Sequence, residues 1–405
     1  MKAQGLKSNL FTLGMIGIVM LLPAMLFGQE EEIKEGYQFT LLKELPSTPA
    51  KNQYKSSTCW SFSSISFLES ELLRLGKGEY DLSEMFIVYH TYYDKAIRYA
   101  RWQGNVNFAA GGAFHDVLTV IDEKGIVPEE VYSGKVIGEK DHMHNEMDAV
   151  LTGFMQALIK NQNGKLTPVW PLAIKGILDA YLGAYPEKFT YKGKDYTPES
   201  FAESLELDLG NYVEIGSYTH HPFYERFIIE LPDNWMMDEI YNVPLDEMMA
   251  IIDYSLENGY TVGWGADISE KGFSWTNGVA VVPAVDLDDL TGTEREKWEK
   301  LTQKEREKLV YSFTEPVPER VITQEIRQEA FDNYQTTDDH GMHITGTGKD
   351  QNGVEYFYVK NSWGTTGNEY NGFFYASKPF VAYKTIDILV HKDGIPKEIR
   401  KKLGL

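Results

Sequence analysis

The decisive stretch of this sequence is Asn52-Gln53-Tyr54-Lys55-Ser56-Ser57-Thr58-Cys59-Trp60-Ser61-Phe62-Ser63, which holds the only cysteine in 405 residues. Apolar residues recur downstream of it at spacings of three and four, which predicts one buried helical stripe, formed by Ile65, Leu68, Leu72 and Leu75. Ser57 or Thr58 can cap this helix, because hydroxyls accept hydrogen bonds from the free N–H groups of a first turn. The Cys59 thiol would then lie at the positive end of the helix dipole, which favours the thiolate. The alternative is an inert, buried cysteine.

The first 28 residues have the pattern of a signal peptide. Lys2 and Lys7 form a positive segment, and residues 13–27 form an apolar segment that ends at Gly28. We expect cleavage near Gly28, with an uncleaved membrane anchor as the alternative. No other stretch reaches the roughly 18 apolar residues needed to span a bilayer. The sequence therefore predicts an exported protein, periplasmic or extracellular, with no stable membrane association after cleavage.

The chain is strongly acidic, with a formal net charge of −21 from 39 basic and 60 acidic residues. Loss of the signal peptide removes two lysines and no acid, which brings the charge to −23. Such a surface argues against binding to nucleic acid or to anionic membranes. One cysteine cannot form an intramolecular disulfide, so stability must come from a large core, which a chain of this length can build. A lone thiol kept in an exported protein favours a chemical role.

The hydrophobic periodicity predicts a mainly helical first part and a mainly β last part. The predicted helices cover 59–75, 84–99 with Ser83 as N-cap, 113–124, 146–161, 168–184, 198–206 and 245–258. Predicted strands cover 260–266, 279–282, 341–348, 354–360, 373–376 and 384–391, with a tight turn at 349–353. We also expect one exposed, salt-bridged helix over 293–309, a helix over 322–334 and a short helix in the tail.

Four histidines lie in the loops of the predicted helical part: His142, His144, His220 and His221. No carboxylate or thiol stands at convincing ligand spacing beside them, so we predict no metal and no other cofactor. We interpret these side chains as solvated. The pair Gly111-Gly112 could bring backbone close to a ligand or to a packed neighbour, and we favour packing from the residues alone.

A cysteine nucleophile needs a base and a group that orients the base. The predicted hairpin brings both His340 and His343 close to Asn361, and its register does not choose between them. Their odd separation places the two histidines on opposite faces of the strand, so only one can face Cys59. The amide of Gln53, together with the Cys59 N–H, can hold a developing oxyanion.

These motifs resemble the active-site segments of papain-like cysteine peptidases. The matching segments are Asn52-Gln53 with Cys59-Trp60-Ser61-Phe62-Ser63, Asp339-His340-Gly341 with Gly346, and Lys360-Asn361-Ser362-Trp363-Gly364. The resemblance assigns the catalytic position to His340, which makes His343 a strand residue that faces away.

Two departures from the papain pattern indicate a branch. Ser57 stands where the papain signature has a cysteine, and His340 follows Cys59 by 281 residues (340 − 59) rather than by roughly 130–150. A disulfide-free core with long insertions resembles the bleomycin hydrolase and aminopeptidase C branch. Residues 109–128 and the ending, 390–405, are similar to that branch too.

The resemblance implies an α+β, papain-like fold with two lobes and a cleft between them. In residues 29–405 we expect a helical lobe with large insertions over 36–260 and a β-barrel-like lobe over 261–392. In that branch the C-terminal tail, here 393–405, lies along the cleft, and its carboxylate engages the free amine of the substrate. Leu405 would be that end here. The branch also forms ring-like hexamers and is usually cytosolic, whereas this chain has a signal peptide and is shorter.

The sequence thus predicts an exported cysteine peptidase that removes N-terminal residues from peptides through a thioester. Under the resemblance Cys59 is the nucleophile, His340 the acid and base, and Asn361 the orienting group. Gln53 binds the oxyanion. The expected substrate-binding residues are Gly111, Gly112, Trp363 and Leu405. The alternatives are an endopeptidase with an open cleft and a non-catalytic papain-fold protein that binds peptides.

Overall fold

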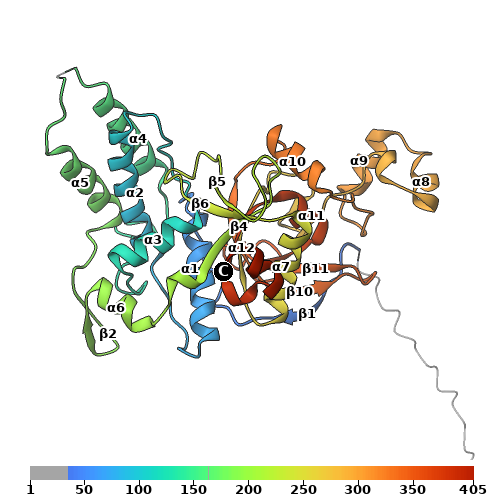
Figure 1. Ribbon diagram of the computed structural model, residues 1–405, viewed down its shortest axis with the longest axis horizontal. Helices are drawn as coiled ribbons and strands as arrows, with labels where there is room; N and C mark the ends of the chain where they lie inside the picture. The colour runs from blue at the N-terminus through green and yellow to red at the C-terminus, as the bar shows by residue number, and fades with distance from the viewer. Residues whose placement is uncertain (1–34, 163) are drawn as a thin grey trace, which may run out of the picture. The chain divides into compact units, whose positions relative to one another are not determined.

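Helix α1, Cys59–Arg74, is the element on which the two halves of the chain meet. The computed structural model describes residues 35–162 and 164–405. Nearly every side chain of α1 from Trp60 to Leu72 is buried, as in a helix that passes through a core. It contacts helices α2 (Glu84–Arg101) and α3 (Phe114–Lys124) as well as strands β7 and β10. Figure 1 shows α2, α4 (Asn145–Ile159) and α5 (Trp170–Leu182) on one side of α1, and β10 (His340–Lys349) and β11 (Glu355–Lys360) of the large sheet on the other.

Residues 35–405 form one compact unit. The predicted signal peptide, residues 1–28, lies outside the described residues. In the described part of the chain, no helix has both the length and the apolar character that a membrane span requires.

The helices of the first part lie within a few residues of their predicted ranges. Ser83 caps α2 as expected, because its Oγ accepts a hydrogen bond from the Phe86 N–H at 3.0 Å. The remaining helices of this part are α4 Asn145–Ile159, α5 Trp170–Leu182, α6 Pro198–Leu205 and α7 Leu245–Glu257. The apolar side chains of α1 to α6 form one continuous cluster. A separate small hairpin, β2 Phe189–Tyr191 and β3 Lys194–Tyr196, follows α5.

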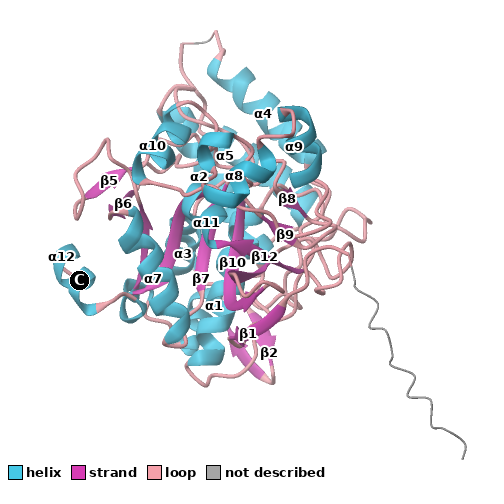
Figure 2. Ribbon diagram, turned by 90° about the vertical axis from the view of Figure 1, so that its right-hand side faces the viewer, coloured by secondary structure: helices cyan, strands magenta, loops and turns pink. Residues whose placement is uncertain are grey.

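One large sheet, drawn in magenta in Figure 2, fills the second part. Its strands are β1 Thr40–Glu44, β4 Tyr212–Gly216, β5 Arg226–Ile228, β6 Glu239–Asn242, β7 Val262–Ala266, β8 Phe273–Ser274, β9 Val279–Ala280, β10 His340–Lys349, β11 Glu355–Lys360, β12 Phe373–Ser377 and β13 Thr385–His391. They run in the order β5-β6-β4-β13-β7-β10-β11-β12-β9-β8, and β1 pairs with β10. The path begins at β5 and ends at β8, and among the described residues no pairing joins those ends, so the expected barrel-like lobe is not confirmed.

Strand β10 carries the predicted histidines, and its first residues pack on the first turn of α1. A Cβ on Gly341 would lie 2.6 Å from Ser63 Oγ and 3.3 Å from the Cys59 carbonyl oxygen. Only a residue without a side chain allows this approach. The glycine after His340 therefore brings the histidine segment against the cysteine segment.

The structure corrects several element predictions. The expected helix over 293–309 is two short helices, α8 Gly292–Trp298 and α9 Gln303–Val310. Thr302 and Glu305 form a capping box that starts α9, a signal that the charge pattern alone did not show. Strands β4, β5 and β6 lie within the range expected to be mainly helical. The last helices are α10 Gln324–Asp332, α11 Lys378–Lys384, which was not predicted, and α12 Lys397–Leu403.

Candidate active site

Cys59 is the first residue of α1, and no side chain caps that helix end. Thr58 occupies the N-cap position, but its hydroxyl pairs with Ser56 Oγ at 2.6 Å instead of accepting from the helix. The predicted side-chain cap is therefore wrong. Its absence matters, because the first N–H groups of a helix have no partner within the helix. They stay available to a negative charge at the thiol or on a substrate.

The loop before Cys59 is bent at two positions that carry side chains. Tyr54 has φ = 49° and Ser57 has φ = 56°, a left-handed conformation that costs on the order of 1 kcal/mol in each case. The loop is held by a short pairing with a distant segment. The Lys55 N–H donates to the His142 carbonyl, and the His144 N–H donates to the Lys55 carbonyl, both at 3.1 Å. This packing offsets the strain and fixes Gln53 relative to Cys59.

His340 is held by Asn361 in one defined orientation. The His340 Nε2–H donates to Asn361 Oδ1 at 2.7 Å, and the same oxygen accepts from the Ser362 N–H at 2.8 Å. A hydrogen bond at Nε2 leaves Nδ1 as the nitrogen that can accept a proton. The ring of Trp363 lies over the imidazole with a centroid distance of 5.1 Å, which shields the bond from water.

Gln53 borders the same cavity as Cys59 and His340. The Ser362 hydroxyl donates to Gln53 Oε1 at 2.5 Å, and the Gln53 N–H donates to the Ser362 carbonyl at 2.8 Å. The first bond uses the acceptor end of the side-chain amide, and the second holds the backbone of Gln53 in place. The donor end, Nε2, thus has no partner among the described residues.

Burial keeps the thiol and the imidazole neutral when each is considered alone. It raises the pKa of Cys59 to about 12, against the N–H groups of Gly341 and Trp60, which lower it. Burial also lowers the pKa of His340 to about 4, although the hydrogen bond that His340 donates to Asn361 raises it. The thiolate expected from the helix dipole is therefore not the favoured form of an isolated thiol. A proton that moves from sulfur to imidazole creates two opposite charges side by side, and each lowers the cost of the other.

His343 lies on the other face of β10. Its Nδ1 pairs with Ser66 Oγ of α1 at 2.8 Å, and it does not line the cavity. The register of β10 against β11 sets His343 opposite Lys360, one residue before Asn361. The hairpin thus brings both histidines near Asn361, as predicted, and only His340 bonds to it.

The two glycines at 111 and 112 line the cavity, but their neighbours explain why no side chain is present. A Cβ on Gly111 would lie 1.8 Å from Asp233 Oδ2, and one on Gly112 would lie 2.8 Å from the indole of Trp60. The Gly111 carbonyl is also already bonded to the ammonium group of Lys95. Packing therefore accounts for the absence of a side chain at both glycines, and their role in substrate binding stays a prediction.

The C-terminal residue does not reach the cavity. Leu405 packs at the edge of the sheet core, and its N–H donates to the Arg400 carbonyl at 3.0 Å. The preceding helix, α12, buries Ile399 and Leu403 in the core that contains α7. The expected position of the tail along the cleft is therefore corrected.

The cavity has a volume of about 350 Å³ and is richer in acids than the sequence suggested. Asp338 stands two residues before His340, and Asp387 lies within β13, where every residue is buried. Asp233 and His115 complete this wall. Sequence reasoning missed all four. The signal that could have revealed Asp387 is a charged residue in the middle of an apolar strand.

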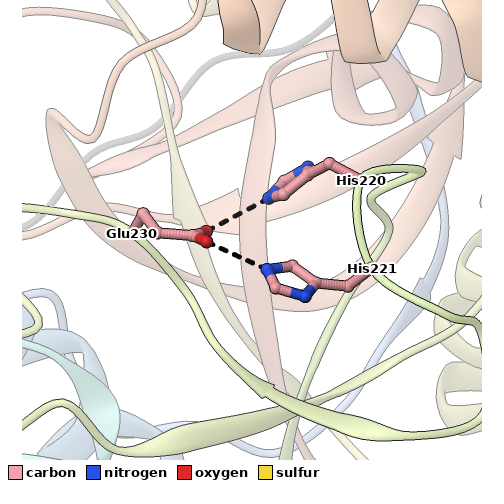
Figure 3. A group of neighbouring side chains, drawn as sticks. All are labelled: His220, His221 and Glu230. Atoms are coloured by element: carbon pink, nitrogen blue, oxygen red, sulfur yellow. Dashed lines mark hydrogen bonds and ion pairs between the residues drawn. The ribbon is translucent and has the colours of Figure 1, made fainter.

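The other histidines divide into two kinds. His142 and His144 are only 5% and 4% exposed, so their interpretation as solvated is wrong. His220 and His221 are more open, and both contact the carboxylate of Glu230, at 3.1 and 2.9 Å (Figure 3). Their three ligand atoms lie within 4.8 Å of one another, an arrangement that could hold a metal ion and that the sequence spacing did not show. None of the three residues lines the cavity.

Comparison with known proteins agrees with this geometry. Residues 310–404, which include His340 and Asn361, match the Peptidase C1-like family. Aminopeptidase C of Listeria monocytogenes is 24% identical over 88% of this chain and 83% of its own length. Aminopeptidase G of Lactobacillus delbrueckii subsp. lactis is 20% identical over 89% of this chain and 85% of its own length.

A solved structure has the same fold. The crystal structure of PepW from Lactobacillus rhamnosis HN001 superposes with a TM-score of 0.64, at 18% identity, over 90% of this chain and 84% of that one. These matches confirm the resemblance found in the sequence, to papain-like cysteine peptidases of the bleomycin hydrolase and aminopeptidase C branch, and the chain is a cysteine-type peptidase.

Proposed function

We propose that the protein is an exported aminopeptidase that cleaves peptides through a thioester on Cys59. The observation that carries the proposal is the common cavity of Gln53, Cys59 and His340, with His340 bonded to Asn361. A nucleophile, an oriented base and an open amide donor on one cavity are the parts that acyl transfer requires. The names of the relatives, aminopeptidases C and G, support action at the N-terminus.

The residues would divide the reaction as follows. His340 Nδ1 takes the thiol proton while the sulfur attacks the scissile carbonyl carbon. Gln53 Nε2 and the Cys59 N–H hold the resulting oxyanion. The C–N bond breaks as the imidazolium returns its proton to the leaving amine. Water, deprotonated by His340, then adds to the thioester, and the C–S bond breaks to release the acid and restore the thiol.

Two measurements on the purified protein test this proposal. A thiol-directed peptidyl inhibitor should label the wild-type protein and not Cys59→Ala, which should also lose hydrolysis of free-amine fluorogenic peptides. The control is Ser66→Ala, which removes a hydroxyl of α1 that bonds to His343 outside the cavity and should keep the labelling. Undiminished hydrolysis by a clean preparation of Cys59→Ala would overturn the mechanism.

Export is a separate part of the proposal, since it rests on residues 1–28 alone. N-terminal sequencing of the protein from its native cells should show a mature chain that begins close to Gln29. A chain that keeps Met1 and stays in the membrane fraction would support the anchor instead. Hexamer formation, expected from the branch, can be checked by light scattering on the mature protein.

A further inference from the structure

Two carboxylates of the cavity wall, those of Asp338 and Asp387, have no hydrogen bond to a lysine, an arginine or a neutral donor side chain among the described residues. Asp338 makes no hydrogen bond to any described residue. Burial and then the charges of Asp233 and Asp339 raise its pKa to about 7. Asp387 is only 8% exposed, and its side-chain neighbour is the carboxylate of Glu214, which is also an acceptor. Burial, followed by the charge of Glu214, raises the pKa of Asp387 well above its usual range. Two acceptors that face each other need a proton or a cation between them.

The positive groups nearby do not balance these charges. His115 Nδ1 contacts Glu214 at 3.1 Å; burial would lower the pKa of His115, but Glu214 and then Asp116 raise it to about 10. The Lys95 ammonium group bonds to the carbonyls of Ala109 and Gly111. Four aspartates line the cavity: Asp233, Asp338, Asp339 and Asp387. Asp339 is exposed and accepts from Thr337, and Asp233 accepts from Asn107 and is near the charge of Lys95. Asp338 and Asp387 are left with the His115 imidazolium as the nearby cation. Leaving a buried charge unpaired costs several kcal/mol.

Asp387 supplies an independent sign of a ligand. It is only 8% exposed, it lies on a strand whose other residues pack in the core, and it borders the cavity; its side-chain hydrogen-bond partner among the described residues is another carboxylate, that of Glu214. The described acids of the cavity do not form a group of three whose ligand atoms lie within 4.8 Å of one another. Among the described residues, the ligand atoms of only one group, His220, His221 and Glu230, lie within 4.8 Å of one another. A larger organic cation fits the spread of the aspartates better.

The geometry points to a cation subsite, formed by Asp338 and Asp387, that binds a positive group of the peptide substrate beside Cys59. That group is an ammonium or guanidinium, either the N-terminal amine or a Lys or Arg side chain. The inference rests on the proposed function and names the charge of its substrate. It also gives the cavity wall the role that the branch assigns to the C-terminal carboxylate, which here lies elsewhere.

The subsite would also act on the nucleophile. Burial raises the Cys59 pKa most, and the negative charge of Asp338 raises it further. A cation bound to Asp338 cancels that charge, so the thiol becomes easier to deprotonate when a suitable substrate is present. Asp338 would then be both a substrate-binding residue and a device that activates the thiol only in the complex.

Four fluorogenic amides separate the two sources of the cation: lysyl and norleucyl amides, each with a free and with an acetylated amine. Norleucine has a similar length to lysine and no charge. If the amine is bound, Asp338→Asn and Asp387→Asn should raise KM for the free-amine substrates about tenfold to a hundredfold and erase their advantage over the acetylated ones. If the side chain is bound, the advantage of lysyl over norleucyl should collapse instead. The matched control, Asp288→Asn, removes a charge at a side chain that is 98% exposed and should change neither ratio.

A second measurement uses the wild-type protein and does not need turnover. Iodoacetamide alkylates the Cys59 thiolate, and norleucinol and lysinol carry the cations without a scissile carbonyl. Lysinol should shift the pH profile of alkylation to lower pH in either case, norleucinol should do so only if the amine is the bound group, and uncharged 1-hexanol should not. Unchanged substrate ratios in both variants, together with an unshifted profile, would overturn the subsite. Failure of the proposed function looks different, because the wild type would then hydrolyse none of the four amides.

Discussion

Two sets of carboxylates in this molecule can be compared: Glu69 and Glu84, which form ion pairs with Lys51, and Asp338 and Asp387, which line the cavity. Only the first set has lysines as counter-charges. The Lys51 ammonium lies 2.7 Å from Glu84 Oε1 and 3.4 Å from Glu69 Oε1. Burial raises the pKa of Glu84 to about 7, and Lys51 opposes that rise. Among the described residues no lysine forms an ion pair with Asp338 or Asp387, while the charge of Lys95 acts on the neighbouring Asp233.

The first set extends into a network that includes Lys360 and Thr48. Lys360 Nζ donates to Thr48 Oγ1 at 3.0 Å, and that hydroxyl donates to Glu69 Oε2 at 2.5 Å. Each polar group has a partner, so the network contributes to a single fold. The cavity acids lack such partners. Lysines thus neutralise the buried acids of the first set, whereas no lysine pairs with Asp338 or Asp387 beside the nucleophile. We therefore assign the neutralising charge at Asp338 and Asp387 to a ligand.

The largest expected effect is the difference in activity between variants of His340, which belongs to the cavity, and of His343, which belongs to the region of the lysine network. His340 lines the cavity, while His343 lies near the lysine network with Lys360. His340→Ala should lower kcat/KM by about three to four orders of magnitude, because the proton acceptor is lost. His343→Ala should keep most of the activity but lower the free energy of unfolding by about 1–3 kcal/mol, since Ser66 loses a buried partner.

Steady-state kinetics with titrated active sites and urea unfolding check this pair of variants. The reverse pattern, an inactive but stable His343→Ala protein beside an active His340→Ala protein, would contradict the assignment of the base.

The next effect concerns stability in the two acidic sets. Lys51→Met leaves Glu69 and Glu84 without a counter-charge and should lower the free energy of unfolding by about 3 kcal/mol. Asp387→Asn should raise it at pH 7.5. The raised pKa means that, without a bound cation, folded Asp387 holds a proton that the unfolded chain has lost above pH 3.8. This group therefore destabilises the fold increasingly as the pH rises from there.

Urea unfolding at pH 7.5 and at pH 4 measures both changes. The gain in Asp387→Asn should shrink at the lower pH, where the unfolded carboxyl is also largely protonated. A destabilised Asp387→Asn protein at both pH values would mean that the carboxylate already has a partner in the fold.

The sequence was sufficient for the parts of the site that depend on local pattern. The helix at Cys59, the hairpin that links His340 to Asn361, and the cap at Ser83 all follow from spacing and turn chemistry within a few residues. The choice between the histidines came from motif spacing in the resemblance and not from the residues alone.

What the sequence could not show depends on contacts between distant segments. Asp338, in the loop before β10, and Asp387, in β13, line the same cavity, and Glu230 contacts two histidines nine and ten residues earlier. Thr58 matches the cap rule, but its hydroxyl finds Ser56 first. In each case a tertiary contact decided the role of a residue whose local pattern allowed several.

The smallest expected effect is at the chain end. Leu405 does not line the cavity, so deletion of this one residue should leave the preference for free-amine over N-acetylated peptides within about twofold of the wild type. Deleting more would disturb Leu403, which is 7% exposed and part of the sheet core. Asp338→Asn, measured on the same substrates, provides the contrast, because it should lose the preference. A deletion that raised cleavage of acetylated peptides more than about fivefold would show that the terminal carboxylate reaches the substrate in solution. Asp338 and Asp387 would then not be the residues that bind the substrate amine.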